Sequence, residues 1–166
     1  TNFNTGSTRE ILDAGIPLVS TQVQYSLLDS RPEKGLVELC RERGLQLLCY
    51  GTLAGGLLSD AWLGQPEPVE PLANRSHSKY KLIIEDFGGW ALFQELLAAL
   101  HAIAQRHSVG LGDVATRWVI DRPQVASAIM GFTSTRHLPS ALRIETLRLD
   151  ADDHARLDPL LARRTG

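Results

Sequence analysis

The sequence predicts an α/β protein with parallel strands. Segments with a strand pattern alternate with segments with a helix pattern along most of the chain, as in repeated βα units. The clearest strand, residues 45–49 (LQLLC), is almost uniformly apolar, which is typical of a strand covered on both faces. It runs directly into the small-residue loop 50–56 (YGTLAGG), whose glycines allow the backbone to approach a flat or charged group. These patterns are compatible with a closed barrel and with an open, doubly wound sheet.

The chain begins with residues that have the composition of the end of a strand, Thr1-Asn2-Phe3. A short helix is expected to follow at once. Ser7 and Glu10 have the spacing of a capping box at its start, and Gly15 marks its end.

The second strand is predicted over residues 19–26 (VSTQVQYS), where two sets of side chains alternate. Because a buried amide needs a hydrogen-bond partner, Gln22 or Gln24 is expected to have one. The segment 30–33 (SRPE) has the form of a second capping box, and Gly44 marks the end of the helix that follows.

Residues 59–90 contain several prolines and glycines and little periodicity, which predicts a long loop. Loops of this length are often lids, so we expect the segment to close over a ligand, with Lys79 and Lys81 meeting phosphate charge. The alternative is a surface excursion that its aromatic residues attach to the body of the protein.

The last third of the chain again alternates helix and strand. A strong helix is predicted over residues 92–107, and a small-residue strand over 125–132 (VASAIMGF). The caps expected for the other helices of this region are Asp113, Ser134 or Thr135, and Asp150.

Composition excludes several classes of function. The 166 residues are 43% hydrophobic and 22% charged, with a net charge of −2, so a nucleic-acid partner is not expected. No apolar run has membrane-spanning length, and the histidines lack metal-site spacing, so neither a membrane nor a metal is expected. Cys40 and Cys49 indicate packed thiols in a reducing compartment, the cytoplasm. Because the chain begins with Thr1 rather than Met, we expect a segment before it.

The loop after residue 49 is the strongest candidate for a functional site. A buried strand that ends in small residues with one aromatic has the form of a cofactor rim. A tight turn with Tyr50 filling the core fits the same residues equally well. The phosphate-binding patterns GxGxxG and GxxxxGK[ST] are absent from the sequence, which argues against a Rossmann or P-loop site.

Three short motifs, in this order, resemble the aldo-keto reductase family: Thr1-Asn2-Phe3, Gln22-Val23-Gln24-Tyr25 and Tyr50-Gly51-Thr52-Leu53. The resemblance covers essentially the whole chain. It implies a TIM (β/α)8 barrel, of which residues 1–166 form roughly the second half as a single unit, from the end of strand five through strand eight and a C-terminal helix. The loop 59–90 would then follow strand seven.

The resemblance also implies cofactor-binding roles. Thr1, Asn2 and Gln22 would hold the nicotinamide carboxamide, and Tyr50 would stack on the ring. Gly51, Thr52 and Leu53 would lie along the pyrophosphate.

The adenosine end would be held by the turn after the last strand. That turn contains Gly131, Thr133, Arg136 and His137. Thr133 stands where the family commonly has an arginine for the 2′-phosphate, with Arg136 as a substitute, and His137 and Ala141 stand at the adenine side. The resemblance implies NADP as the cofactor, and these departures leave NAD as an alternative.

The implied activity is hydride transfer between the nicotinamide and an aldehyde, ketone or sugar carbonyl. The family's catalytic Asp, Tyr, Lys and His lie on earlier strands, so no catalytic residue is expected in this chain, and neither Tyr25 nor Tyr50 is assigned as the proton donor. A non-catalytic nicotinamide-binding subunit, as the potassium-channel β subunits partly are, is the alternative; a barrel piece without a ligand is a third. The sequence favours no oligomeric state.

An isolated half-barrel is expected to be inactive and to associate. Its edge strands would present unpaired backbone groups, and inward residues such as Val23, Leu47 and Ile129 would face water.

Overall fold

The computed structural model describes residues 1–69, 75–131 and 134–165, without the side chain of residue 136. Short 3₁₀ helices lie at Arg31–Glu33, Ala54–Gly56, Asp60–Trp62 and Thr135–His137. The other elements, in chain order, are α1 (Thr5–Asp13), β1 (Ser20–Gln24), α2 (Leu36–Arg43), β2 (Gln46–Tyr50), α3 (Arg75–Phe87), α4 (Gly89–His107), α5 (Leu111–Ile120), β3 (Val125–Ile129), α6 (Leu138–Thr146) and α7 (Ala151–Leu161).

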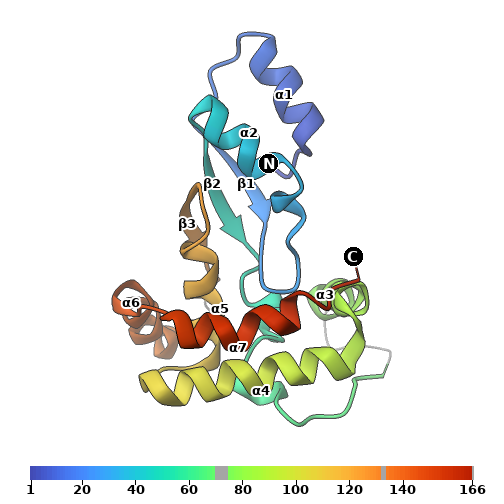
Figure 1. The fold of residues 1–166 in the computed structure, drawn as a ribbon, viewed down its shortest axis with the longest axis vertical. Coiled ribbons are helices and arrows are strands. Elements are labelled where there is room, and N and C mark those ends of the chain that lie inside the picture. Colours follow the sequence, from blue (N-terminus) through green and yellow to red (C-terminus); the bar gives the residue numbers. More distant parts are fainter. Residues whose placement is uncertain (70–74, 132–133, 166) are drawn as a thin grey trace.

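The described strands form one parallel sheet in the order β1-β2-β3, so the expected α/β architecture with parallel strands is confirmed (Figure 1). β2, the apolar strand, is central and pairs with a neighbour on each side. In chain order, α2 connects β1 to β2, and α3, α4 and α5 connect β2 to β3. Parallel neighbouring strands need such crossover connections.

The two faces of the sheet differ in burial. Val23 and Leu47 are 4% and 0% exposed because they lie on the face against which α2 and α5 pack. The expectation that both would face water is therefore wrong: alternation shows that two sets exist, but not which set the helices cover. On the opposite face Ile129 is 42% exposed, as expected for a residue that would point into a barrel.

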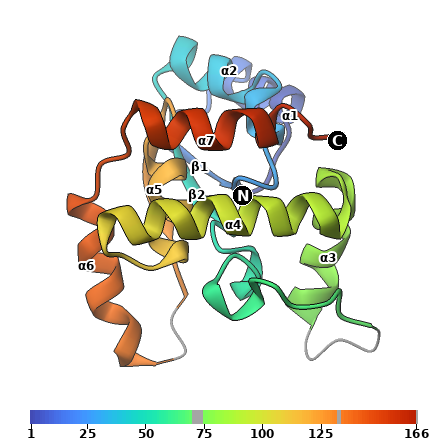
Figure 2. The ribbon, with the colours of Figure 1, turned by 60° about the horizontal axis from the view of Figure 1, so that its bottom comes forward.

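Helix α4 organises the helical part of the protein. It packs against α3, α5 and α7, and its apolar side is fully buried (Figure 2). α3 meets α4 at 93°, and Gly88 forms the corner with a φ of 139°. A Cβ at Gly88 would lie 2.7 Å from Leu92 Cδ2, so the corner requires glycine.

Two predicted caps are displaced by one helical turn. Asn4, not Ser7, caps α1: its Oδ1 accepts a hydrogen bond from the Ser7 amide at 2.8 Å. Helix α5 begins after Gly110, and Asp113 in its first turn accepts from the Gly110 amide at 3.0 Å. Asp113 resembles a cap because its side chain bonds to the N-cap amide from three positions further along the helix.

Two other expectations of local structure are corrected. Residues 30–33 form no capping box; they make a 3₁₀ turn, and α2 starts after Gly35. The segment 59–90 is not a continuous loop, since it contains the 13-residue helix α3. Its apolar positions Tyr80, Ile84 and Phe87 are buried at helical spacing.

The start of the C-terminal helix is as expected. Asp150 caps α7 by accepting from the Asp153 amide at 3.0 Å. Asp153 is fully buried and pairs with Arg106 and with His107, whose Nε2 lies 2.7 Å from its Oδ2. These contacts attach the end of α4 to the start of α7.

Helix α6 begins at Leu138, preceded by the 3₁₀ turn Thr135–His137. The N-cap residue of α6 is therefore His137 rather than Ser134 or Thr135. In the described part of the chain, no single helix is long and apolar enough to cross a membrane; α3 and α4 meet the length and composition criteria only as a bent pair.

Candidate functional site

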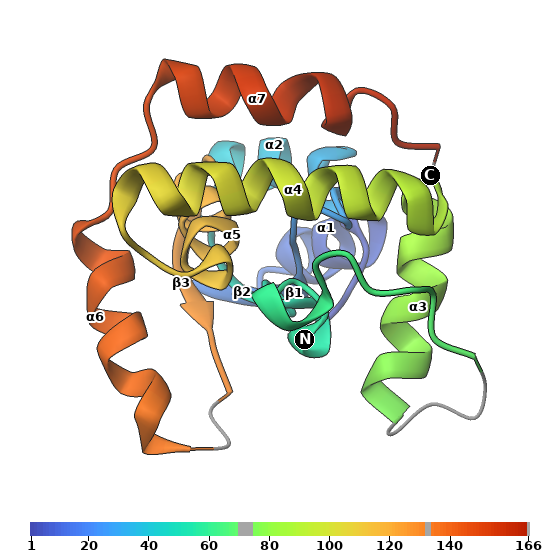
Figure 3. The ribbon, with the colours of Figure 1, turned by 90° about the horizontal axis from the view of Figure 1, so that it is seen from below.

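The carboxyl ends of the described strands form one row. Gln24 pairs with Tyr50, and Tyr50 pairs with Ile129. We refer to this row as the carboxyl edge. Helices α3 and α6 lie on opposite sides of it, with the loop that follows β2 between them (Figure 3). Parallel α/β proteins bind their ligands at this end of the strands, because the loops that leave the strands converge there.

Tyr50 ends the central strand and is half-buried, so it lies outside the buried core. The ammonium group of Lys79, on α3, lies 5.4 Å from the centre of the Tyr50 ring and 5.1 Å from that of Tyr80. The ring therefore borders solvent beside a positive charge. Lys81, which was expected to act with Lys79, instead pairs with Glu67 at 3.3 Å.

The loop after Tyr50 is held close to α3. Gly51 has a φ of 74°, and a Cβ there would lie 2.5 Å from the Tyr80 hydroxyl. Thr52 is buried, and its Oγ1 lies 3.3 Å from that of Thr116 on α5. Leu53 is half-buried. The backbone between Gly51 and Leu53 is thus fixed from two sides.

The N-terminal residues lie beside β1. The Asn2 amide donates to the Gln22 carbonyl oxygen at 2.6 Å, and Asn2 has a φ of 62°. Thr1, Asn2 and the Gln22 side chain are all exposed. The structure therefore places Thr1 and Asn2 beside Gln22. These are the three residues that were expected to hold the nicotinamide carboxamide.

The third group of expected residues follows β3. Gly131 is exposed, two residues past the carboxyl edge, and His137 is exposed at the start of α6. Arg136 lies in the preceding turn, and Thr133 is outside the described residues.

A charged cluster that the sequence analysis did not predict lies beside this row. Gln24 is 3% exposed, and its Nε2 donates to Asp29 Oδ2 at 2.7 Å, which confirms the expected partner for a buried glutamine. Asp29 also binds Arg31 in a bidentate manner, at 2.8 and 2.6 Å. The hydrogen bonds that Arg31 donates to the Asp29 carboxylate raise the pKa of Arg31 above its usual value. The only signal in the sequence was the need of Gln24 for a partner.

The Tyr25 hydroxyl, which follows β1 at the carboxyl edge, is buried and already hydrogen-bonded. Tyr25 is 1% exposed and donates to Glu33 Oε1 at 2.6 Å. Burial, followed by that hydrogen bond, raises its pKa far above the usual value. The Tyr25 hydroxyl therefore stays protonated and hydrogen-bonded to Glu33.

A cluster with metal-ligand chemistry exists elsewhere, at the junction of α4 and α7. His107, Asp150 and Asp153 place one ligand atom each within 4.8 Å of the others. Arg106 pairs with both carboxylates, so their charge is already compensated. The cluster is explained by its role in joining two helices.

The edge thus combines an exposed amide, a bordering aromatic ring, a fixed loop and two cationic side chains, Lys79 and Arg31. Such a surface suits a flat polar ring with an anionic tail. The motifs in the sequence resemble the aldo-keto reductases, and comparison with protein families agrees with that resemblance. The sequence model of the Aldo/keto reductase family matches residues 1–162, and the chain belongs to that family.

Curated relatives agree with this assignment. The chain is 35% identical over 123 residues to flagellar radial spoke protein 5 of Chlamydomonas reinhardtii, covering 72% of this chain and 23% of that protein. It is 30% identical over 136 residues to protein tas of Escherichia coli, covering 82% of this chain and 37% of that protein. It is 29% identical over 145 residues to the chloroplastic pyridoxal reductase of Arabidopsis thaliana, covering 87% of this chain and 36% of that protein.

Solved structures share the fold. The glycerol dehydrogenase AKR11B4 from Gluconobacter oxydans matches with a TM-score of 0.80 at 20% identity, over 98% of this chain and 48% of that one. The thermostable aldo-keto reductase Tm1743 matches with a TM-score of 0.66 at 23% identity, over 96% of this chain and 46% of that one. The chain therefore spans less than half the length of these proteins, and its sheet is part of an aldo-keto reductase TIM barrel.

Proposed function

We propose that this chain is the cofactor-binding half of an NADP-dependent oxidoreductase. The complete protein would transfer a hydride between the nicotinamide and an aldehyde, ketone or sugar carbonyl. The observation that carries the proposal is the position of Tyr50, half-buried at the end of the central strand with the Lys79 ammonium 5.4 Å from its ring centre. An aromatic ring beside a cation suits a nicotinamide that is tethered to phosphates.

The proposed nicotinamide contacts are Thr1, Asn2 and Gln22 for the carboxamide and Tyr50 for the ring face. The 2.6 Å bond from the Asn2 amide to the Gln22 carbonyl supports this assignment, because it holds the first two groups beside the third. An exposed glutamine amide can both donate to and accept from a carboxamide. The ring would then be held in one orientation, which hydride transfer requires.

The remaining contacts would serve the rest of the cofactor. Gly51, Thr52 and Leu53 would follow the pyrophosphate. The turn with Gly131, Thr133, Arg136 and His137 would hold the adenosine end, close to the amides at the start of α6. NADP is favoured through Arg136 as a partner for the 2′-phosphate, and NAD is the alternative.

The bound dihydronicotinamide would supply the hydride. The proton would come from the part of the barrel that precedes this chain, since Tyr25 is buried against Glu33. We therefore propose that residues 1–166 alone do not turn over substrate. The two free cysteines, Cys40 and Cys49, are buried, which is in keeping with a cytoplasmic location.

The proposal is tested by mixing the purified full-length protein with NADPH and a panel of aldehydes, ketones and sugars. The expected result is loss of the reduced-nicotinamide absorbance together with formation of the matching alcohol. Binding of NADPH without turnover of any member of the panel would contradict the enzymatic role.

That second outcome would favour a non-catalytic nicotinamide-binding subunit. The observation on its side is the 35% identity to a protein named flagellar radial spoke protein 5. The two candidates differ in turnover and agree in cofactor binding, so the same experiment separates them.

A further inference from the structure

Helix α6 is attached to the rest of the protein largely by polar contacts. Among its side chains only Ile144 is buried, and Leu138 and Leu142 are 51% and 69% exposed. A surface helix is normally attached by a stripe of buried apolar side chains, which α6 lacks. The polar contacts of α6 therefore contribute a large part of its attachment.

Asp113, in the first turn of α5, makes the central polar contacts to α6. It is 2% exposed, accepts a hydrogen bond from the Ser140 hydroxyl, and lies 3.4 Å from Arg143 Nε through its Oδ2. Both partners belong to α6. The same carboxylate accepts from the Gly110 amide at 3.0 Å. Because a buried carboxylate needs a cation and hydrogen-bond donors, Asp113 favours the position of α6 that supplies them.

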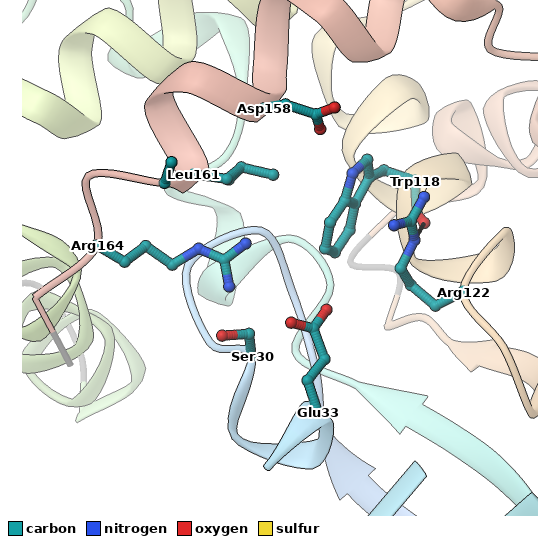
Figure 4. A pocket seen from close by; sticks show the side chains of 8 residues that line it. Ser30, Glu33, Trp118, Arg122, Asp158, Leu161 and Arg164 are labelled. Carbon is teal, nitrogen blue, oxygen red and sulfur yellow. Dashed lines mark hydrogen bonds between the residues drawn. The ribbon is translucent and has the colours of Figure 1, made fainter. Parts of the chain in front are cut away.

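Helix α5 is itself firmly held. Trp118 is 2% exposed, and the Tyr25 ring meets it edge-on at 6.1 Å. Trp118 also lines a pocket together with residues of the turn Arg31–Glu33 and of α7 (Figure 4). One turn earlier, the buried Thr116 places its Oγ1 3.3 Å from that of Thr52. Asp113 is therefore carried by a helix whose position is fixed from several sides.

The first turn of α5 also contacts the loop that follows β2. A Cβ at Gly112 would lie 3.0 Å from Leu53 Cδ2, so the turn and the loop are closely packed. The Leu111 amide donates to Asp60 Oδ2 at 3.4 Å. A single turn of α5 thus holds both the loop Gly51–Leu53 and α6, the segments assigned above to the pyrophosphate and the adenosine end of the cofactor.

We propose that Asp113 is a positioning residue for the cofactor, an inference that rests on the proposed function. It acts through Ser140 and Arg143, which set the place of α6 relative to the loop Gly51–Leu53. This placement has to match the span between the adenosine and the pyrophosphate, since small displacements of binding groups are costly. Release of α6 would weaken the contacts at the adenosine end and leave those of Tyr50 with the nicotinamide in place.

Binding of the cofactor and its two halves to the full-length protein, measured by calorimetry, tests the inference. Ser140→Ala removes the hydroxyl that donates to Asp113 and leaves the bond from the Gly110 amide intact. It should weaken the binding of NADPH and of 2′,5′-ADP about fivefold, because a charge-assisted hydrogen bond is lost, and leave that of reduced nicotinamide mononucleotide unchanged. Thr146→Ala is the matched control, since its hydroxyl donates within α6 to the Arg143 carbonyl at 3.2 Å.

Asp113→Asn separates positioning from charge. Removing a carboxylate near an anionic cofactor would by itself tighten binding, whereas loss of the pairing with Arg143 should weaken the binding of NADPH. Tighter binding by this variant, or unchanged NADPH affinity of Ser140→Ala, would overturn the inference, as would equal losses for the two halves of the cofactor. A wild-type protein that binds no NADPH would contradict the proposed function itself, and the inference with it.

Discussion

The Lys79 ammonium lies 5.4 Å from the centre of the Tyr50 ring, although the two residues belong to α3 and β2 and are separated by a segment rich in proline and glycine. The cation and the ring interact favourably, and the contact keeps a positive charge at the carboxyl edge. An anionic ligand that binds at the carboxyl edge could therefore contact the Tyr50 ring and the Lys79 ammonium group together.

Replacing Lys79 by Met should weaken NADPH binding to the full-length protein by about 1 kcal/mol, with a larger effect at low salt. The substitution keeps the apolar stem and removes the charge. Lys81→Met is the matched control, since Lys81 is already paired with Glu67 at 3.3 Å. Fluorescence titration at two salt concentrations measures both, and equal losses for the two variants would argue against a specific role of Lys79.

Tyr50→Ala should weaken NADPH binding by about 1 kcal/mol or more, which is the order of an aromatic contact. Tyr50→Phe keeps the ring and should bind nearly as well as the wild type. Unchanged affinity of the alanine variant, with only a lower melting temperature, would show that Tyr50 acts in packing.

Gly51→Ala should destabilise the protein more than Gly44→Ala. Both glycines have a φ near 70°, at 74° and 72°, but a Cβ at Gly44 meets nothing within 4 Å, whereas one at Gly51 would lie 2.5 Å from the Tyr80 hydroxyl. Strain at positive φ costs about 1–3 kcal/mol at either site, so the difference measures the clash.

Removing the Tyr80 hydroxyl provides the check on this interpretation. In the Gly51→Ala background, Tyr80→Phe should restore part of the lost stability in urea unfolding. If the added substitution restores nothing, the close approach of α3 to the loop is not the cause.

The pairing of Asp150 with Arg106 should make stability depend on pH in the acid range. Hydrogen bonds from Arg106 lower the pKa of Asp150 from 3.8 to about 2. A carboxyl with a lowered pKa in the folded protein contributes stability above its unfolded value, and this contribution is lost as the pH falls toward the folded value. Asp150→Asn keeps the capping oxygen and removes the charge. Its melting temperature should fall less than that of the wild type between about pH 4 and 2.

The sequence predicted those features that depend on strong local patterns. The central strand follows from an apolar run that ends in small residues, and the start of α7 from Asp150 placed just before a helical stripe. The row Gln24, Tyr50 and Ile129 could be expected as well, because the carboxyl ends of parallel strands meet at one edge.

Features that depend on tertiary packing could not be predicted in this way. Val23 and Leu47 are buried because helices cover their face, which alternation alone does not reveal. Helix α3 was missed because prolines and glycines surround it, although Tyr80, Ile84 and Phe87 have helical spacing. The contact between Lys79 and Tyr50 depends on where α3 lies, and no local pattern specifies that.

Hydrogen–deuterium exchange of the full-length protein, with and without saturating NADPH, tests the central claim most directly. If residues 1–166 are the cofactor-binding half, the cofactor should slow exchange at residues 1–3, at the loop 50–56 and at the start of α6. The peptide that covers residues 36–43, in α2 on the other face of the sheet, should be unaffected. Protection confined to the part of the protein outside residues 1–166 would contradict the assignment.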